Sequence, residues 1–362
     1  MTLARRLVGM AAGAAGVAVA GTAVEVVRRR RVIARRGAGD RAPLGSLRSA
    51  PLTVVASDGV PLHVEVDEYV PTVEQGRRRT GKTAAPPLTV VFVHGYALNL
   101  DCWHFQRSGY RGLVRTVYYD QRSHGRSGRS SIGHATIEQL GHDLKQVLDD
   151  VVPDGPIVLV GHSMGGMTIV ALAELHPELF GDRVAGVGLI STTAGGLDPS
   201  RIVLPVLPLS IGGGLTHRAV RLLGRGHRVI DGLRRMGKDF AMVATDLFAF
   251  GDEVPQAYVE FVDNMLAETP FEVVAEFFPS FGSLDKFHAV EVLGQVPTAV
   301  ICGTRDRVTS IGHSRKLHAS ITGSTLLECE GAGHMVLMER HDQVNAELDQ
   351  LLAAAAATVE TR

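Results

Sequence analysis

The stretch PIVLVGHSMGGMTIVALAELHP, residues 156–177, carries the most informative local pattern of the sequence. An apolar run leads into GHSMG at 161–165, and a second apolar segment follows. This order predicts a buried strand, a tight turn and a helix, with Ser163 at the turn. A serine there takes a strained backbone conformation, and glycines flank it because a Cβ would clash with the neighbouring chain. Ser163 is therefore a candidate nucleophile at the edge of a sheet.

A serine hydroxyl becomes a good nucleophile only when a base takes its proton and a third group orients that base. Asp306 follows the apolar run of PTAVICGTRDRV, and His334 lies in the glycine-flanked GAGHM before the last predicted helix. Each has an ordinary alternative, such as a helix N-cap for Asp306 or a bystander among 15 histidines. Their joint placement after predicted strands favours a triad with Ser163. Asp198 is the alternative acid.

Attack by a serine on a carbonyl creates an oxyanion, which two backbone N–H groups must stabilise. The residue after the nucleophile, Met164, offers one of them. The second is expected from the loop after the apolar run 88–93, where the sequence continues HGYALN. Tyr96 is the predicted donor in that loop. We interpret His94 as a buried residue that braces the loop.

From residue 88 onwards, short apolar runs alternate with helical segments, which predicts βαβ units and a mostly parallel sheet. Before them, two β runs surround Asp58-Gly59, a hairpin signal. A helix is predicted after Thr136, with Gln139 completing a capping box. The apolar face of that helix should lie on the sheet; it comprises Ile137, Leu140, Leu144, Val147 and Leu148. The predicted strands of the alternating part are 88–93, 114–119, 156–161, 184–190, 297–302 and 324–329.

The strand rhythm stops between about 191 and 296, and we predict a largely helical lid at about 193–288, inserted after the sixth strand. Nine of the 12 Phe lie at 240–287, where they form the core of the lid, line an apolar tunnel, or do both. Between Arg201 and Lys238 there are eight basic residues and one acidic residue. Such a stretch can rest on anionic lipid headgroups, and a solvated helix face is the alternative.

These motifs together resemble the serine α/β-hydrolases, over about residues 52–355. The resemblance is carried by FVHGYALN, YYDQRSHGRSG, LVGHSMGGM, CGTRDRV and GAGHM, in wording similar to actinobacterial esterase- or lipase-like members. The chain order Ser163, Asp306, His334 also matches that family. One departure is Ser123, where many relatives have Gly; it touches a structural turn. The resemblance implies an α/β-hydrolase fold with about eight strands.

The same resemblance implies an enzyme that cleaves a carboxylic ester or thioester, with no metal or organic cofactor. The Phe-rich and basic lid and the amino-terminal segment favour an apolar, lipid-like substrate. The triad Ser163, Asp306 and His334 would form an acyl-enzyme, and the N–H groups of Tyr96 and Met164 would bind the oxyanion. Related enzymes use such a triad for C–C bond hydrolysis or haloperoxidase-like perhydrolysis, so these reactions stay open. A non-catalytic scaffold on the same fold is a further hypothesis.

Several other partners are disfavoured by composition and context. The formal net charge of −1 argues against a general nucleic-acid binder. GRRRTGKTAAPP at 76–87 fits the P-loop pattern, but Pro86-Pro87 and the strand run after them leave no place for a helix to begin. We therefore predict a basic loop without a bound nucleotide. The three cysteines fit neither a disulfide framework nor a zinc site and are expected to be buried or incidental thiols.

The amino terminus differs from the rest of the chain, and we divide the sequence into a segment 1–40 and a hydrolase domain 41–362. Residues 7–24 carry no charge but are rich in Ala and Gly, and arginines flank them on both sides. A signal anchor would leave the more basic flank and the catalytic domain on the cytoplasmic side of a membrane. An export signal cleaved after 18–20 and a soluble Ala-rich helix are the alternatives.

Overall fold

The computed structural model describes residues 32–33, 36, 43–70, 88–131, 133–197 and 238–361. Its centre is an eight-stranded sheet with the order β1-β2-β4-β3-β5-β6-β7-β8. β2 pairs antiparallel with β1 and β4, and every other neighbouring pair is parallel. The strands are β1 Pro51–Val55, β2 Pro61–Asp67, β3 Thr89–Val93, β4 Arg115–Tyr119, β5 Ile157–His162, β6 Val184–Ile190, β7 Thr298–Gly303 and β8 Thr325–Cys329. The predicted hairpin and all six predicted apolar strands are confirmed.

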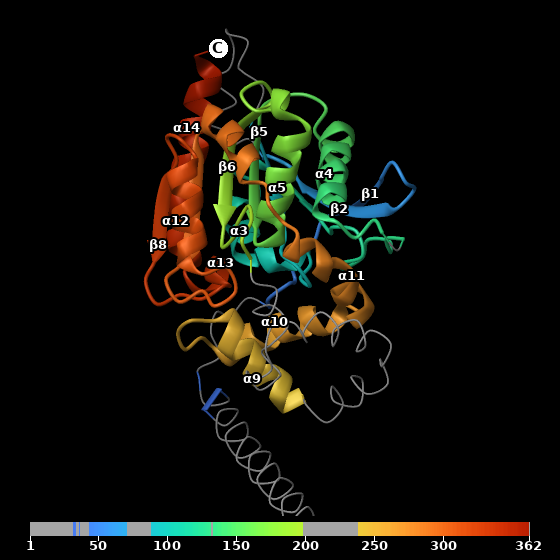
Figure 1. Cartoon of the computed structure of the whole chain (residues 1–362), viewed down its shortest axis with the longest axis vertical. Helices are drawn as coiled ribbons and strands as arrows, with labels where there is room; N and C mark the ends of the chain where they lie inside the picture. Colours follow the sequence, from blue (N-terminus) through green and yellow to red (C-terminus); the bar gives the residue numbers. More distant parts are fainter. Residues whose placement is uncertain are drawn as a thin grey trace, which may run out of the picture.

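Helices cover both faces of the sheet (Figure 1). Alternate residues of a strand point to opposite faces, so Val90 and Phe92 of β3 join one apolar cluster and Val91 and Val93 join another. The first cluster includes residues of α14, and the second includes residues of α4, α5 and α12. The helices of this part are α3 His104–Tyr110, α4 Ile137–Val151, α5 Met164–Leu175, α12 Ile311–Ser320, α13 Val336–Glu339 and α14 His341–Glu360, with short 3-10 helices η1 Leu100–Trp103 and η2 Pro177–Leu179.

Helix α4 begins with the predicted Thr136 N-cap, whereas the side-chain amide of Gln139 donates to Asp143 at 3.2 Å and not back to the cap. The hydroxyl of Thr136 accepts a hydrogen bond of 3.1 Å from the N–H of Gln139. All five residues of its predicted apolar face are buried. A polar cap and an apolar stripe at helical spacing therefore place this helix on the sheet.

Helices joined by short loops form most of the part of the segment between β6 and β7 that the structure describes. It contains α9 Lys238–Ala249, α10 Gln256–Glu268, α11 Phe271–Gly282 and η3 Phe287–Gln295. Figure 1 shows α9, α10 and α11 beyond the end of the sheet toward which the β6 arrow points. Its role as a lid stays a prediction. The basic stretch 201–237 lies outside the described residues.

Two residues of the amino-terminal region, Ile33 and Arg36, contact the domain. Ile33 is fully buried within the first apolar cluster, and the Arg36 guanidinium pairs with the carboxylate of Asp246 in α9 at 2.5 Å. Of the helices that the structure describes, none combines the length and apolar character needed to cross a membrane. The uncharged run 7–24 and the P-loop-like stretch 76–87 fall outside the described residues.

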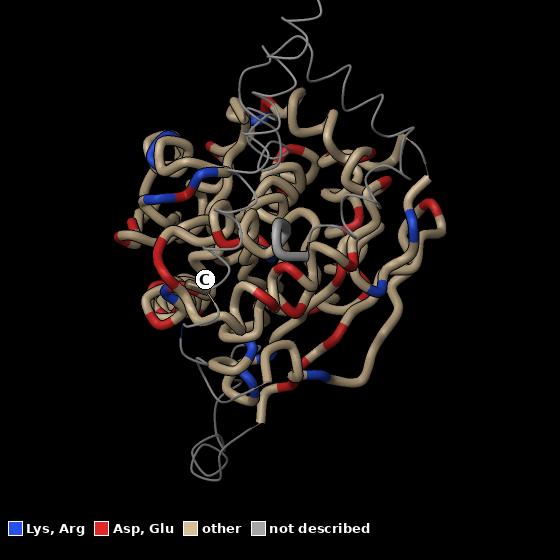
Figure 2. The backbone as a smooth tube through the Cα atoms, turned by 90° about the horizontal axis from the view of Figure 1, so that it is seen from below, with Lys and Arg blue, Asp and Glu red and all other residues tan. Residues whose placement is uncertain are grey.

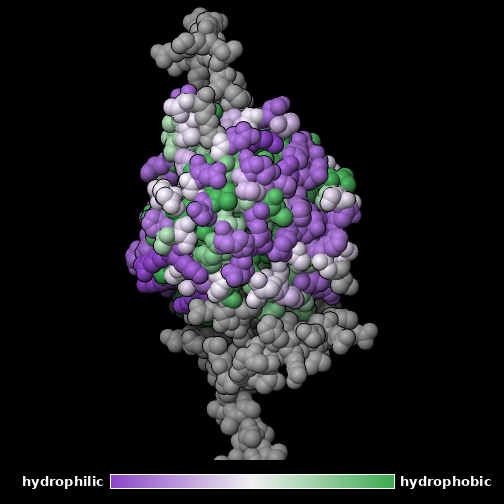
Figure 3. Space-filling view, turned by 45° about the horizontal axis from the view of Figure 1, so that its top comes forward, coloured by the Kyte–Doolittle hydropathy of each residue, from purple (hydrophilic) through white to green (hydrophobic). Residues whose placement is uncertain are grey.

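The surface and the thiols agree with an ordinary globular domain. Hydrophilic side chains cover much of the coloured part of the face in Figure 3, and Figure 2 shows Asp and Glu dispersed along the described chain with Lys and Arg among them. The three cysteines, Cys102, Cys302 and Cys329, are free and buried. Ser123 has a φ of 66°, a conformation that favours glycine, which confirms that the Gly-to-Ser departure lies at a turn.

Candidate active site

Ser163 lies at the turn between β5 and α5 with φ 52° and ψ −117°, a strained conformation for a residue with a side chain. The glycines around it have no space for a Cβ. On Gly161 it would lie 2.5 Å from the carbonyl oxygen of Gly165, and on Gly165 it would lie 2.0 Å from that of Val93. The strand, turn and helix predicted around Ser163 are thus present, and close backbone packing explains the glycines.

The structure brings the three predicted triad residues into one hydrogen-bonded line. The Nε2 atom of His334 lies 3.0 Å from Oγ of Ser163, and its Nδ1 atom lies 2.9 Å from Oδ2 of Asp306. Since an ionised carboxylate can only accept, Nδ1 carries the proton and Nε2 is free to accept from the serine hydroxyl. Ser163 and Asp306 are buried, while the ring of His334 is partly exposed.

The carboxylate of Asp306 is held on every side. Its Oδ1 accepts from the N–H groups of Val308 at 2.8 Å and Thr309 at 2.9 Å, and its Oδ2 accepts from the Thr309 hydroxyl at 2.9 Å. Burial alone would raise the pKa of Asp306, but the adjacent His334 and these hydrogen bonds lower it overall. Asp306 is therefore ionised at neutral pH and fixed in orientation.

The two predicted oxyanion donors lie next to the nucleophile. Met164 is the first residue of α5, where backbone N–H groups have no partner within the helix. A Cβ on Gly95 would lie 3.2 Å from the Cβ of Ser163, so the peptide that leads into Tyr96 packs beside the serine. Among the described residues, the backbone hydrogen bonds of turns and loops include none donated by the N–H of Tyr96 or of Met164. This agrees with two N–H groups that are free to bind an oxyanion.

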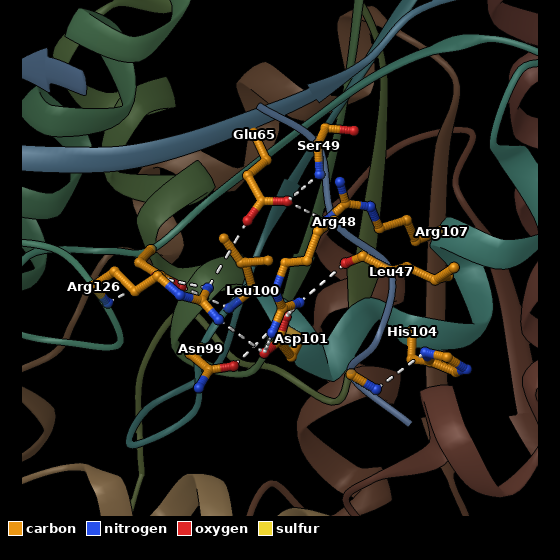
Figure 4. Close-up of polar contacts among 12 residues, drawn as sticks. Leu47, Arg48, Ser49, Glu65, Asn99, Leu100, Asp101, His104, Arg107 and Arg126 are labelled. Carbon is orange, nitrogen blue, oxygen red and sulfur yellow. Dashed lines mark hydrogen bonds and ion pairs between the residues drawn. The ribbon is translucent and has the colours of Figure 1, made fainter. Parts of the chain in front are cut away.

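A polar network holds the loop that carries Tyr96 (Figure 4). The side chain of Asn99 accepts from the N–H of Asp101 at 3.0 Å, and the carboxylate of Asp101 lies 2.6 Å from Nη2 of Arg48 and 3.4 Å from Nη2 of Arg126. The N–H of Leu100 donates to buried Asp120 at 2.8 Å. The loop is therefore restrained by residues from before β1 and after β4.

The insertion contacts the same loop from the other side. The Tyr96 hydroxyl donates to the carbonyl of Val274, and the Thr269 hydroxyl donates to the carbonyl of Ala97 at 3.0 Å. The Tyr96 ring meets Phe281 edge to face, with centroids 4.8 Å apart. Both predicted oxyanion residues belong to or pack against one apolar cluster, which also contains Met167, Leu197, Val273, Phe277, Phe281 and Leu284.

Two buried histidines next to the site brace its loops. His94 donates from Nδ1 to the carbonyl of Gly95 at 2.8 Å and accepts at Nε2 from the N–H of Gln121 at 2.9 Å, which fits the bracing interpretation. His162 lies 3.0 Å through Nε2 from the carbonyl of His334. Burial lowers the pKa of both His94 and His162 to about 3, so both rings are neutral at pH 7.

Three further expectations concern residues and groups outside the line of Ser163, His334 and Asp306. The alternative acid, Asp198, lies outside the described residues. Among the residues that are described, no group of three or more His, Cys, Asp or Glu could hold a metal ion, and the absence of a cofactor stays a prediction. Sequence reasoning missed Thr309, which binds Asp306, and Glu339, whose carboxylate contacts the loop before His334. A hydroxyl three residues after the acid was the available signal for Thr309, and none pointed to Glu339.

Comparison with known proteins now identifies the family. The profile described as "Alpha/beta hydrolase family" matches residues 90–347, which is most of the chain. The chain belongs to the alpha/beta hydrolase family. This alpha/beta hydrolase is 26% identical over 259 residues to a dihydrolipoyllysine-residue acetyltransferase component of an acetoin cleaving system from Pseudomonas putida, covering 72% of this chain and 62% of that protein. The chain thus spans less than two thirds of that relative.

The similarity to actinobacterial proteins is confirmed as well. The alpha/beta hydrolase is 26% identical over 270 residues to the uncharacterized protein Rv2715 of Mycobacterium tuberculosis, with 72% of this chain and 73% of that one covered. The name of that protein states no activity. The similarity therefore supports a common origin, and the reaction has to be inferred from the residues of the site.

Solved structures share the fold. An esterase from Thermogutta terrifontis superposes with a TM-score of 0.63 at 22% identity, covering 85% of this chain and all of that one. An enol-lactonase from Burkholderia xenovorans LB400 gives 0.63 at 24%, with 83% of this alpha/beta hydrolase and 100% of that chain covered. A bromoperoxidase from Bacillus anthracis gives 0.62 at 18%, with coverages of 84% and 100%. At these identities the similarity shows the fold alone. The three solved structures are named after three different reactions, those of an esterase, an enol-lactonase and a bromoperoxidase.

Proposed function

We propose that this protein is a serine hydrolase that cleaves a carboxylic ester or thioester of an apolar, lipid-like molecule through an acyl-enzyme. One observation carries the proposal: the hydrogen-bonded line from Ser163 through His334 to Asp306, with distances of 3.0 Å and 2.9 Å. A serine with a base and an orienting carboxylate in this arrangement is equipped for acyl transfer.

The proposed reaction starts when Oγ of Ser163 attacks the carbonyl carbon while Nε2 of His334 takes the hydroxyl proton. The negative charge that develops on the carbonyl oxygen is met by the N–H groups of Tyr96 and Met164. His334 then gives its proton to the departing alcohol or thiol, which leaves the acyl group on Ser163. Water activated by the same histidine releases the acid and restores the serine.

Asp306 has an indirect role in this scheme. It accepts the Nδ1 proton of His334, which keeps Nε2 as the acceptor that faces Ser163. When His334 gains a proton, the adjacent carboxylate stabilises the imidazolium. The hydrogen bonds from Val308 and Thr309 support this role because they keep Asp306 ionised and immobile.

The preference for an apolar substrate is supported by the neighbours of the oxyanion donors. Met164 and Tyr96 pack with Val273, Phe277 and Phe281, which come from the insertion. Val273, Phe277 and Phe281 are buried in the described structure, so an acyl group would meet this aromatic and aliphatic packing only when the insertion opens to admit it. Long acyl chains gain about 0.8 kcal/mol for each CH₂ that they bury.

Perhydrolysis or lactone hydrolysis on the same residues is the second candidate, and the bromoperoxidase and enol-lactonase neighbours favour keeping it. C–C bond hydrolysis remains an alternative from the sequence motifs. A non-catalytic scaffold has less support, since a scaffold has no use for a strained serine that is hydrogen-bonded to a histidine–aspartate pair.

Labelling with a fluorophosphonate, combined with p-nitrophenyl esters of increasing acyl length, tests the proposal. The wild-type protein should react covalently at one residue and turn over esters, and Ser163→Ala should lose both activities. Asp342→Asn is a suitable control because its side chain is 94% exposed. Labelling that persists in Ser163→Ala would mean a different nucleophile, and unreactive wild type would support a scaffold.

The location of the protein rests on the sequence alone. We infer that residues 7–24 hold the protein at a membrane and that the arginines after them keep the catalytic domain on the cytoplasmic side. Basic residues at 201–238 would add attraction to anionic lipid, each about 1 kcal/mol near the surface. Export and a soluble cytoplasmic state are the alternatives that fractionation distinguishes.

A further inference from the structure

The carboxylate of Glu339 connects the loop of His334 to the insertion between β6 and β7. Its Oε1 accepts from the N–H of Gly333 at 2.6 Å, and its Oε2 accepts from the N–H groups of Gly251 at 3.1 Å and Asp252 at 3.2 Å. Gly333 directly precedes His334, whereas Gly251 and Asp252 lie between α9 and α10. One side chain at the end of α13 thus fastens two distant segments together.

The two loops approach each other more closely than side chains would allow. A Cβ on Gly251 would lie 2.2 Å from the carbonyl oxygen of Gly331, and a Cβ on Gly333 would lie 2.5 Å from the nitrogen of Gly251. On the other side of the histidine, the N–H of Met335 donates to the carbonyl of Ala249 at 2.8 Å. The backbone of the insertion therefore packs directly on the backbone of the histidine loop.

Asp252 extends this connection to the loop of the acid. Its carboxylate lies 2.8 Å from Nη1 of Arg305 and 2.5 Å from Nη2 of Arg340. Arg305 directly precedes Asp306, and its N–H donates to the carbonyl of Ala332 at 2.9 Å. The base and the acid of the proposed triad are both attached to the same short turn of the insertion.

We propose that Glu339 is a positioning residue for His334 and that the peptide groups of Gly251 and Asp252 are the fixed surface against which it acts. The inference rests on the proposed serine-hydrolase mechanism. A carboxylate that accepts several N–H bonds makes charge-assisted contacts, which are stronger than those of a neutral acceptor. The turn between α9 and α10 is therefore part of the catalytic framework, whatever the rest of the insertion does as a lid.

The test compares Glu339→Gln and Glu339→Ala with Glu328→Gln. Glu328 is a matched control because both of its carboxylate oxygens are likewise bound, here by Arg315 at 2.7 Å, at a partly exposed position in β8. With short p-nitrophenyl esters, kcat should fall about tenfold in Glu339→Gln and about a hundredfold in Glu339→Ala, as expected when a base is displaced by about 1 Å. KM should change less than about threefold because Glu339 touches no substrate in this scheme.

A second measurement separates positioning from general stability and does not need turnover. NMR of isotope-labelled His334 in a Ser163→Ala background should show shifted or broadened ring signals when Glu339 is replaced, and unchanged signals for Glu328→Gln. If Glu339→Ala does not fold, Glu339→Gln carries the test alone.

The outcomes distinguish failure of the positioning role of Glu339 from failure of the proposed serine-hydrolase reaction. Wild-type kcat in folded Glu339 variants, or a lower melting temperature with unchanged His334 signals, would overturn the positioning role. His334 signals that move in a protein that never hydrolyses esters would support the positioning role and remove the proposed reaction instead.

Discussion

Gly165 packs so tightly on Val93 that a Cβ at position 165 would lie 2.0 Å from the Val93 carbonyl oxygen. The contact joins the start of α5 to the end of β3, and the loop that follows β3 carries Tyr96. This backbone contact therefore couples the position of the strained serine to that of the loop beside it.

Gly165→Ala should accordingly lower the free energy of unfolding by about 3 kcal/mol or more, because backbone on both sides must move to admit the methyl group. Gly312→Ala is the matched control: its Cβ would lie 3.8 Å from the nearest atom, and alanine favours the helix by up to about 1 kcal/mol. Urea denaturation of both variants gives the comparison. Equal stabilities would contradict the packing argument.

Replacing Asp306 by Asn should reduce kcat/KM by about 10³- to 10⁴-fold in the proposed mechanism. The amide can donate a hydrogen bond to Nδ1 of His334, which favours the tautomer with its proton on Nε2, and that tautomer cannot accept the proton of Ser163. Steady-state kinetics with a short ester, beside Asp342→Asn as the exposed control, measures the effect. Activity within tenfold of wild type would point to a different acid, with Asp198 the first to examine.

Tyr96→Phe should have a small effect on catalysis and a measurable one on stability. The proposed oxyanion contact uses the backbone N–H of Tyr96, which the substitution retains, so kcat should change less than about threefold. The phenol donates to the carbonyl of Val274 in α11, and its loss should cost about 1 kcal/mol of unfolding free energy. A tenfold loss of kcat at unchanged stability would show that the hydroxyl itself takes part.

Stability should decline with acidification earlier than carboxylate titration alone would cause. Burial lowers the pKa of His94 and His162 to about 3 and that of His124 to about 4, whereas a histidine in the unfolded chain has a pKa of about 6.5. Below that value the unfolded chain binds protons that the folded chain excludes, so the stability present above pH 6.5 is lost as the pH falls towards 4.

Carboxylates such as Glu65 add to the loss only at lower pH. Burial alone would raise the pKa of Glu65, but hydrogen bonds from His63, Ser49 and Arg107 lower it to about 2. Urea unfolding at pH 7, 6, 5 and 4 should therefore show a falling free energy over the whole range, and His124→Gln should reduce the slope by one proton. A flat profile down to pH 5 would argue against neutral buried histidines.

Truncation at two points distinguishes anchoring from folding. Deleting 1–31 leaves Ile33 and Arg36 in place and should release the protein from membranes with short-ester turnover nearly intact. Deleting 1–42 also removes the buried Ile33 side chain, worth about 1.5–3 kcal/mol, and should lower the melting temperature. Full-length protein in the soluble fraction, or a mature chain that begins near Gly21 outside the cell, would show the anchor hypothesis to be wrong.

Local sequence patterns predicted the strands and the helix start, because these features depend on residues close together in the chain. Runs such as 88–93 and 184–190 became buried strands, and Thr136 capped its helix, because periodicity and capping act within a few residues. The order of Ser163, Asp306 and His334 along the chain pointed to the three side chains that the structure brings together. Strands that end at one edge of a parallel sheet make such meetings predictable.

The contacts of the insertion could not be predicted in the same way. Glu339 and Gly251 are separated by 88 residues, and Arg36 and Asp246 by 210. No periodicity marks either pair, since ion pairs and backbone contacts of this kind depend on how helices stack after folding. The strained φ of Ser123 was visible only as a departure from relatives.

The chain order also determines when each residue of the proposed triad emerges during synthesis on the ribosome. The turn with Ser163 emerges first, whereas Asp306 and His334 follow β7 and β8 and emerge much later. β7 must then find β6 across the whole insertion, and such distant pairing is slow. A nascent chain therefore carries a serine without its base, and in the proposed mechanism it stays inert towards the esters around it. Reactivity would switch on only when the last strands complete the sheet.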